Sequence, residues 1–178
     1  MTRSLLLHIC CGPCSSASIP ALRAVEREVV GFFFNPNIHP FLEFRERLRG
    51  TRKAAAMTGL ELREDLSYDP ASWFADIQSA DGLRCFHCIG MRLDRTAREA
   101  ADRGYTAFST TLAISPWQDH EAIRAGGRAA AACHGVEFVY EDLRPLYPES
   151  RRLSREWDLY RQKYCGCLLS EWERYRER

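Results

Sequence analysis

The sequence predicts an α/β fold in which a mostly parallel, five-stranded sheet carries helices on both faces. Short apolar runs alternate five times with longer segments of helical periodicity, the pattern of strand–helix repeats around a parallel sheet. Turn residues and glycines separate most of these segments. The 178-residue chain is 46% hydrophobic and 28% charged, which suits a globular domain with a sizeable core. We therefore expect a single domain over residues 1–178.

Five short apolar runs are the expected strands. The first ends in a cysteine doublet, and Asn35-Pro36-Asn37, a strong turn signal, stops the second. The expected strands cover residues 5–9, 29–34, 60–65, 105–111 and 136–140.

Longer segments between these runs are the expected helices. Gly59, Gly104 and Gly135 mark the ends of three of them, because glycine adopts the left-handed conformation that closes many helices. A polar turn is expected at residues 79–82. The expected helices cover residues 17–28, 41–57, about 70–78, 88–103 and 120–133, and most of a C-terminal helical segment from about residue 150, with a break at 165–167.

Polar side chains follow several of the expected strands. The carboxyl ends of parallel strands meet at one edge of a sheet, where the strand order reverses, and functional groups gather there. These residues are turn formers or helix caps if they have no function, and substrate-binding groups if they do. The candidates near the strand ends are Asn35, Asn37, His39, Thr110, Thr111 and Ser115.

Seven of the eight cysteines fall into three compact groups, at positions 10, 11 and 14, at 85 and 88, and at 165 and 167. We expect a cytoplasmic protein, because no apolar run approaches the ~20 residues of a membrane span and no secretory apolar region follows the start. Cytosolic thiols stay reduced, so metal ligation or redox chemistry explains such groups better than structural disulfides. The lone Cys133 on an alanine-rich helix is expected to pack in the core.

Each cysteine group has its own chemistry. A helix is expected just after Cys14, and its N-terminus favours thiolates. Cys85-x-x-Cys88 alone suits zinc, an iron–sulfur cluster or thioredoxin-like redox chemistry. With Cys10 and Cys11 it supplies four thiolates, which suit a [4Fe–4S] cluster or structural zinc. The spacing Cys165-Gly166-Cys167 allows a strained, easily reduced disulfide or a metal clamp.

Two stretches are locally basic although the net charge is only +1. Residues 43–53 and 151–163 each hold five basic and two acidic residues, a local charge of +3. Such stretches are either solvated helix faces or phosphate contacts. Near the second, Tyr160 and Lys163 either stack on and pair with a nucleotide or lie on an amphipathic helix. Neither a G-x-G-x-x-G nor a G-x-x-x-x-G-K-[ST] motif is present, which disfavours a dinucleotide cofactor or ATP.

Five long motifs resemble those of the QueH-type epoxyqueuosine reductases, in the same order and spacing over nearly the whole chain. The resemblance implies a fold related to the adenine-nucleotide α-hydrolases (the HUP fold) without their nucleotide site. It also implies the last step of queuosine biosynthesis, the two-electron reduction of epoxyqueuosine to queuosine at the wobble position of tRNA. The motifs are His8-Ile9-Cys10-Cys11-Gly12-Pro13-Cys14, Phe33-Phe34-Asn35-Pro36-Asn37-Ile38-His39-Pro40, Cys85-x-x-Cys88-x-x-x-Arg92-Leu93, Thr110-Thr111-Leu112-x-Ile114-Ser115-Pro116 and Tyr160-Arg161-Gln162-Lys163-Tyr164-Cys165-Gly166-Cys167.

The resemblance also implies roles for the cysteines. Cys10, Cys11, Cys85 and Cys88 would hold a [4Fe–4S] cluster. Cys165 and Cys167 would be a redox-active, catalytic pair supplied by an external electron donor. Cys14 has no settled role in this scheme and is a candidate ligand of a second metal, such as a mononuclear iron, beside the cluster.

Two other classes use similar features. A zinc-stabilised RNA-binding module would use the same cysteines without redox activity. A tRNA thiolation enzyme would share the α/β fold and a cluster, but it would carry a Ser-Gly-Gly phosphate loop after the first strand. This chain has Cys11-Gly12-Pro13 there, which argues against thiolation.

Overall fold

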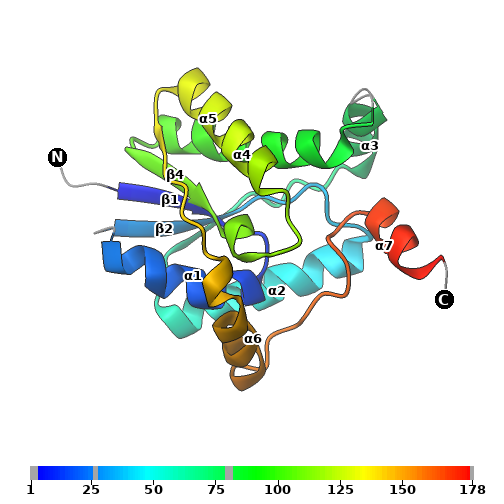
Figure 1. Cartoon of the computed structure of the whole chain (residues 1–178), viewed down its shortest axis with the longest axis horizontal. Coiled ribbons are helices and arrows are strands. Elements are labelled where there is room, and N and C mark those ends of the chain that lie inside the picture. Colours follow the sequence, from blue (N-terminus) through cyan, green and yellow to red (C-terminus); the bar gives the residue numbers. More distant parts are fainter. Residues whose placement is uncertain (1–3, 26–27, 79–81, 177–178) are drawn as a thin grey trace.

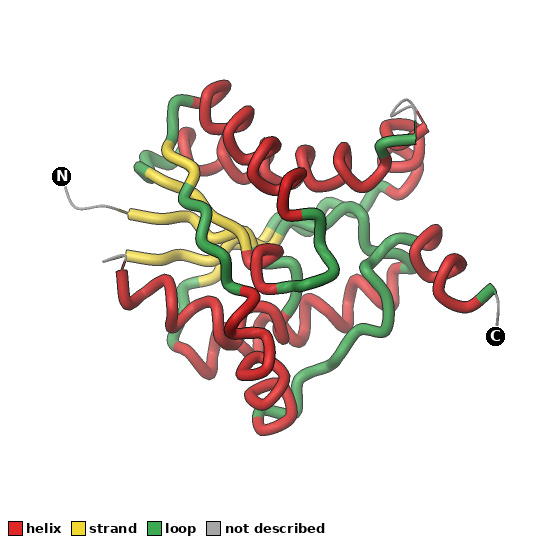
Figure 2. The backbone as a smooth tube through the Cα atoms, viewed as in Figure 1, coloured by secondary structure: helices red, strands yellow, loops and turns green. Residues whose placement is uncertain are grey.

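The computed structural model describes residues 4–25, 28–78 and 82–176. Five parallel strands form one sheet in the order β3-β2-β1-β4-β5, as the sequence predicts (Figures 1 and 2). The strands are β1 (Ser4–His8), β2 (Glu28–Phe33), β3 (Leu62–Glu64), β4 (Ala107–Thr110) and β5 (Glu137–Phe138).

Helices cover both faces of this sheet (Figure 1). The helices are α1 (Gly12–Val25), α2 (Phe41–Thr58), α3 (Pro70–Gln78), α4 (Arg84–Asp102), α5 (His120–His134), α6 (Tyr147–Glu156) and α7 (Leu168–Tyr175), with 3-10 turns η1 (Thr111–Ile114) and η2 (Arg144–Leu146). None of the helices in the described ranges has the length and hydropathy needed to cross a bilayer.

The central strand β1 shows how the core is divided between the two faces. Successive side chains of a strand point to opposite faces. Leu6 packs with α4 and α5 on one face, while Leu5 and Leu7 pack with α1 and α2 on the other. All three leucines are fully buried. The sheet therefore lies between two helical layers, and the carboxyl end of β1 opens at the middle of one edge.

Three helix boundaries differ from those predicted. α1 begins at Gly12 and α4 at Arg84, so Cys14 and Cys85 lie within first helical turns and Cys88 opens the second turn of α4. Proline is tolerated in a first turn, and Pro13 therefore lies within the first turn of α1. α6 begins before residue 150, at Tyr147.

β1 and β2 have the predicted lengths but begin one residue earlier, whereas β3, β4 and β5 are shorter than predicted. Thr111 opens η1 instead of closing β4. Residues 79–81 of the expected polar turn and residues 26–27 of the first expected helix lie outside the described residues.

Two further predictions about the C-terminal half are wrong. Residues 157–164 are not helical, because Asp158 takes a left-handed conformation (φ 46°) directly after α6 and the chain then runs extended beside α2 (Figure 2). The predicted break at 165–167 is confirmed. Tyr160 and Lys163 therefore do not lie on an amphipathic helix. Cys133 is exposed and not in the core, because the buried face of α5 ends at Ala130.

Candidate metal centre

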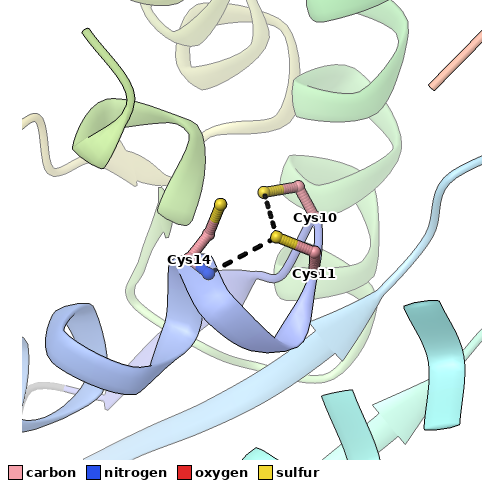
Figure 3. Close-up of side chains that lie close together, drawn as sticks. All are labelled: Cys10, Cys11 and Cys14. Carbon is pink, nitrogen blue, oxygen red and sulfur yellow. Dashed lines mark hydrogen bonds between the residues drawn. The ribbon is translucent and has the colours of Figure 1, made fainter. Parts of the chain in front are cut away.

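Cys10 and Cys11 follow β1 at the point where the strand order reverses. β1 lies between β2 and β4, so the connections from these strands leave on opposite sides of it. Cys10, Cys11 and Cys14 form what we call the first cysteine group. All three sulfurs lie within 4.8 Å of one another, and Figure 3 shows them converging from the end of β1 and the first turn of α1.

The spacing of the first cysteine group fits one metal ion. Two thiolates on a tetrahedral ion with metal–sulfur bonds of about 2.3 Å lie about 3.8 Å apart. The Sγ atoms of Cys10 and Cys11 are 3.9 Å apart. The sulfur spacing of the group therefore matches that of two thiolates bound to one metal ion.

Hydrogen bonds from three elements hold this group. Thr111 accepts from the Cys10 amide (3.1 Å) and donates from its hydroxyl to the Cys10 sulfur (3.3 Å). The Cys11 sulfur accepts from the Cys14 amide (3.4 Å) and from the side-chain amide of Gln162 (3.1 Å). Donors aimed at sulfur stabilise the thiolate form.

The three thiols of the group do not ionise alike. Hydrogen bonds from Cys11 and Cys14 hold the pKa of Cys10 well below its usual range. Burial raises the pKa of Cys11, and hydrogen bonds with Cys10 and Cys11 raise that of Cys14. In the metal-free protein the group thus holds its first negative charge on Cys10.

The other four cysteines of the predicted site form the second cysteine group, Cys85, Cys88, Cys165 and Cys167. Cys88 and Cys167 are buried against Trp73 and Ile77. Cys85 and Cys165 are exposed, and the Cys165 sulfur accepts from the Gln118 side chain at 3.5 Å. All four are free thiols. This group joins the start of α4 to the chain just before α7.

Helix N-termini face both groups. Cys14 lies in the first turn of α1 and Cys85 in that of α4. Cys167 is the N-cap of α7, and its sulfur accepts from the Ser170 amide at 3.4 Å. The N-terminal partial positive charge of each helix lowers the energy of an adjacent thiolate. An anionic metal–thiolate centre is stabilised by this arrangement.

A buried arginine lies between the two groups. Arg92 is only 3% exposed, and no carboxylate in the described part of the chain forms an ion pair with it. Its Nε donates to the Cys88 carbonyl at 3.0 Å. Burial alone would lower the pKa of its guanidinium, but the nearby sulfurs of Cys88, Cys165 and Cys10 raise it. A buried charge needs a counter-charge, and thiolates from both groups are placed to supply it.

His8 and Thr110 connect the strand ends next to the first cysteine group. Burial, followed by the charge of Arg92, lowers the pKa of His8 to about 4, so its imidazole is neutral at pH 7. Nε2 lies 3.1 Å from the Phe34 carbonyl and must donate to it, so Nδ1 accepts from the Thr110 hydroxyl at 2.9 Å. Thr110 also accepts from the Leu112 amide. The predicted substrate residue Thr110 thus ties the ends of β1, β2 and β4 together, while Thr111 holds Cys10.

The turn after β2 places Asn37 and His39 beside the second group and Asn35 beside the chain that leads to Cys10. Asn35, Asn37 and His39 are each at most 2% exposed. Asn35 donates to the Ile9 carbonyl at 2.8 Å, and the His39 amide donates to the Gly166 carbonyl at 2.8 Å. A Cβ at Gly166 would lie 2.8 Å from the Asn37 amide nitrogen, so a larger residue between the two cysteines would displace the buried Asn37 side chain.

These three side chains also have unused polar atoms. Both ring nitrogens of His39 and the side-chain oxygens of Asn35 and Asn37 lack hydrogen-bond partners within the described residues. The His39 ring is stacked on Phe74 with ring centroids 5.2 Å apart and meets Trp73 edge-on. Buried polar atoms without partners are costly, and they are candidates for bonds to a bound molecule.

The remaining predicted residues are more peripheral. Ser115 is half-buried, and its carbonyl accepts from His120. Tyr160 donates to Glu43, and Lys163 is exposed two residues before Cys165. The structure also shows contacts of Arg47, Gln118 and Gln162 with cysteine residues. The sequence places Arg47 in a basic stretch and Gln162 in a family motif, but it does not predict these contacts.

The family model for epoxyqueuosine reductase QueH matches residues 5–173. The chain belongs to this family. A QueH protein from Dehalococcoides mccartyi is 43% identical over 98% of this chain and 96% of its own length. One from Thermotoga maritima is 36% identical, over 96% of this chain and 92% of its own.

Among solved structures, a predicted tRNA methyltransferase subunit from Methanocaldococcus jannaschii has a similar fold. Its TM-score is 0.52 at 13% identity, covering 85% of this chain and 76% of that one. Because the identity is low, this likeness supports the fold alone.

Proposed function

We propose that this QueH family member reduces epoxyqueuosine to queuosine at the wobble position of tRNA. The observation that carries the proposal is the position of one buried arginine, whose pKa responds to sulfurs of both cysteine groups, at the switch point of the sheet. Removing an epoxide oxygen to leave an alkene takes two electrons and two protons and releases water. Paired thiols or an iron centre supply such electrons.

The donor set fits a [4Fe–4S] cluster held by Cys10, Cys11, Cys85 and Cys88. Four thiolates are its usual ligands, and three helix N-termini with Arg92 offset their negative charge. When bound, the cluster would supply single electrons. Cys14 would remain beside Cys10 and Cys11, and their close spacing suits a second mononuclear iron or another metal there.

Cys165 and Cys167 are proposed as the redox-active pair. Oxidation of their two thiols to a disulfide would release two electrons and two protons, which convert the epoxide to an alkene and water. An external electron donor would then reduce the disulfide. The exposed Cys165 would be reached first, and the buried Cys167 lies at the start of α7, where its thiolate is stabilised.

Basic side chains near the second group are placed for the phosphates of tRNA. Residues 157–163, from one of the two basic stretches, run beside α2, which holds the other. Lys53 donates to the Asp158 carbonyl at 2.9 Å, and the Cα of Gly50 faces Tyr160. Arg161 and Lys163 are exposed within this segment, close in sequence to Cys165. Lysine and arginine contacts to phosphate dominate nucleic-acid affinity.

We further propose that residues 1–178 form one metalloenzyme domain in the cytoplasm, with residues from about 150 to 178 completing the site. In support, Gln162 contacts the first cysteine group and Cys165 and Cys167 belong to the second. Asn35, Asn37, His39, Ser115, Tyr160 and Lys163 are the proposed substrate contacts at this edge.

The test is anaerobic reconstitution of the parent, Cys85→Ser and Cys165→Ser, with iron and sulfide analysis and turnover of epoxyqueuosine-tRNA. We expect Cys85→Ser to lose iron and activity, and Cys165→Ser to keep iron but lose activity. Cys133→Ser, an exposed cysteine outside both groups, is the matched control and should match the parent. Full turnover by Cys85→Ser would refute the cluster ligation.

A zinc-stabilised RNA-binding module is the second candidate, because the 3.9 Å sulfur spacing in the first group suits a single tetrahedral ion. It predicts a colourless protein with stoichiometric zinc, no visible iron–sulfur absorption and no turnover. The same reconstitution therefore separates the two functions.

A further inference from the structure

A second set of metal-binding side chains lies outside the candidate centre, between α4 and α5. Asp94 comes from the middle of α4, and Cys133 and His134 are the last two residues of α5. One ligand atom from each lies within 4.8 Å of the other two. The His134 Nε2 and Asp94 Oδ1 atoms are already 2.8 Å apart.

We propose that Asp94, Cys133 and His134 form an accessory site for a divalent transition metal, with zinc the best match. A thiolate, an imidazole and a carboxylate are the three protein ligand types of zinc, and a water would complete a tetrahedron. Because Cys133 is exposed, an ion can reach the site from solvent without passing the candidate centre.

The two helices hold these side chains in place. α4 and α5 approach so closely that a Cβ at Gly126 would lie 3.3 Å from the Gly90 Cα. Sites built on packed helices vary less in geometry than sites on loops. The three ligand atoms lie at most 4.8 Å apart. Small rotations of the exposed Cys133 and Asp94 side chains bring these atoms to the closer spacing of ligands on one ion.

The end of α5 also favours a cation. Gly135 closes this helix in a left-handed conformation (φ 67°), and the last carbonyls carry the helix's negative partial charge. The Asp94 carboxylate adds a full negative charge beside it. The contact between Asp94 and His134 holds both side chains close before the ion arrives, which lowers the entropic cost of binding. The ion then replaces the proton that lies between the two atoms.

The site is tested by zinc titration of the cluster-loaded enzyme in competition with a chromophoric chelator, and by the thiolate charge-transfer absorption of bound Co²⁺. The variants are Cys133→Ser and His134→Asn. Asp102→Asn removes another exposed carboxylate of α4 and is the matched control. Cys165→Ser reports any zinc held by the exposed thiol of the candidate centre.

We expect Cys133→Ser and His134→Asn each to lower the affinity for one equivalent of zinc by at least tenfold. Both variants should also reduce the Co²⁺–thiolate absorption. Asp102→Asn and Cys165→Ser should keep that equivalent. Epoxyqueuosine-tRNA turnover in Cys133→Ser and His134→Asn should equal that of the parent, which shows that both are folded. Equal zinc affinity in the parent, Cys133→Ser and His134→Asn would overturn the site, whatever the activity of the enzyme.

Discussion

The two cysteine groups differ in how the chain builds them. The first is local, because Cys10, Cys11 and Cys14 lie within five residues at the corner between a buried strand and its helix. The second depends on the tertiary fold, since the start of α4 must meet a segment about eighty residues later. A local group persists whenever the sheet is folded, whereas a tertiary one exists only while the distant segment is docked.

The docking of that segment is largely polar. Arg47 of α2 donates to the Cys165 carbonyl (2.6 Å) and the Tyr164 carbonyl (3.0 Å), and the Tyr164 hydroxyl donates to the His39 carbonyl (2.6 Å). Between α6 and Cys165, the segment has one buried aliphatic side chain, Leu159. Regions with few buried apolar contacts open at lower free energy than the core. We therefore expect the second group to open while the first remains intact.

The largest expected effect comes from Arg92, the charge shared by both groups. Arg92→Met removes the counter-charge of several thiolates, so reconstituted iron and activity should fall at least tenfold, since leaving buried charge unpaired costs about 3–5 kcal/mol. Arg92→Lys keeps the charge and should retain more iron. Iron and sulfide content, measured beside circular dichroism to verify folding, checks this. Full iron content in Arg92→Met would show that the two groups do not share its charge.

The next largest effect is expected from Arg47→Ala, which should open the second group without opening the first. Arg47→Ala removes the donor to Tyr164 and Cys165 and leaves the 8%-exposed Glu43 without its 2.8 Å ion-pair partner, at a cost of about 3 kcal/mol. Hydrogen exchange should rise in residues 157–167 and stay unchanged in β1. Arg49→Ala on the same helix, whose side chain is 80% exposed, is the control. Equal increases in both regions would mean that the groups unfold as one unit.

The smallest effect is a pH dependence in the opening of the second group. Burial lowers the pKa of His39, whose backbone binds Gly166 and Tyr164. A histidine with a lowered folded pKa takes up protons more readily when unfolded, so its folded state loses stability as pH falls below about 6.5. Labelling of Cys167 by a thiol reagent, corrected for intrinsic thiol reactivity, should therefore be faster at pH 5.5 than at pH 7. In His39→Phe this difference should shrink, and an unchanged difference would exclude His39 as its source.

The same contrast explains what could be predicted from sequence. Hydrophobic periodicity was sufficient for the parallel strands, because the three central runs are buried between the two helical layers. The first cysteine group was predictable, since its members are neighbours in sequence. The extended path of residues 157–164 was not predictable, because the aromatic and basic side chains there also fit a helix. Their extended path depends on Asp158 and on donors from α2.

Residues that act across long sequence distances were also missed. Gln162 reaches Cys11, and Gln118 reaches Cys165, through contacts that no local pattern encodes. Cys133 was assigned to the core from its alanine-rich surroundings, but those alanines belong only partly to the buried face of α5. Burial of a helix end depends on how far the helix extends past its sheet.

Gln162 and Cys165 lie three residues apart on the same extended segment, yet one covers the Cys11 sulfur and the other carries a thiol of the second group. This extended segment therefore contacts both cysteine groups. If an external reductant must lift it to reach Cys167, the same movement uncovers Cys11. Oxygen damage to the centre would then accumulate with each turnover rather than with time at rest, so an idle enzyme would survive in air longer than a working one.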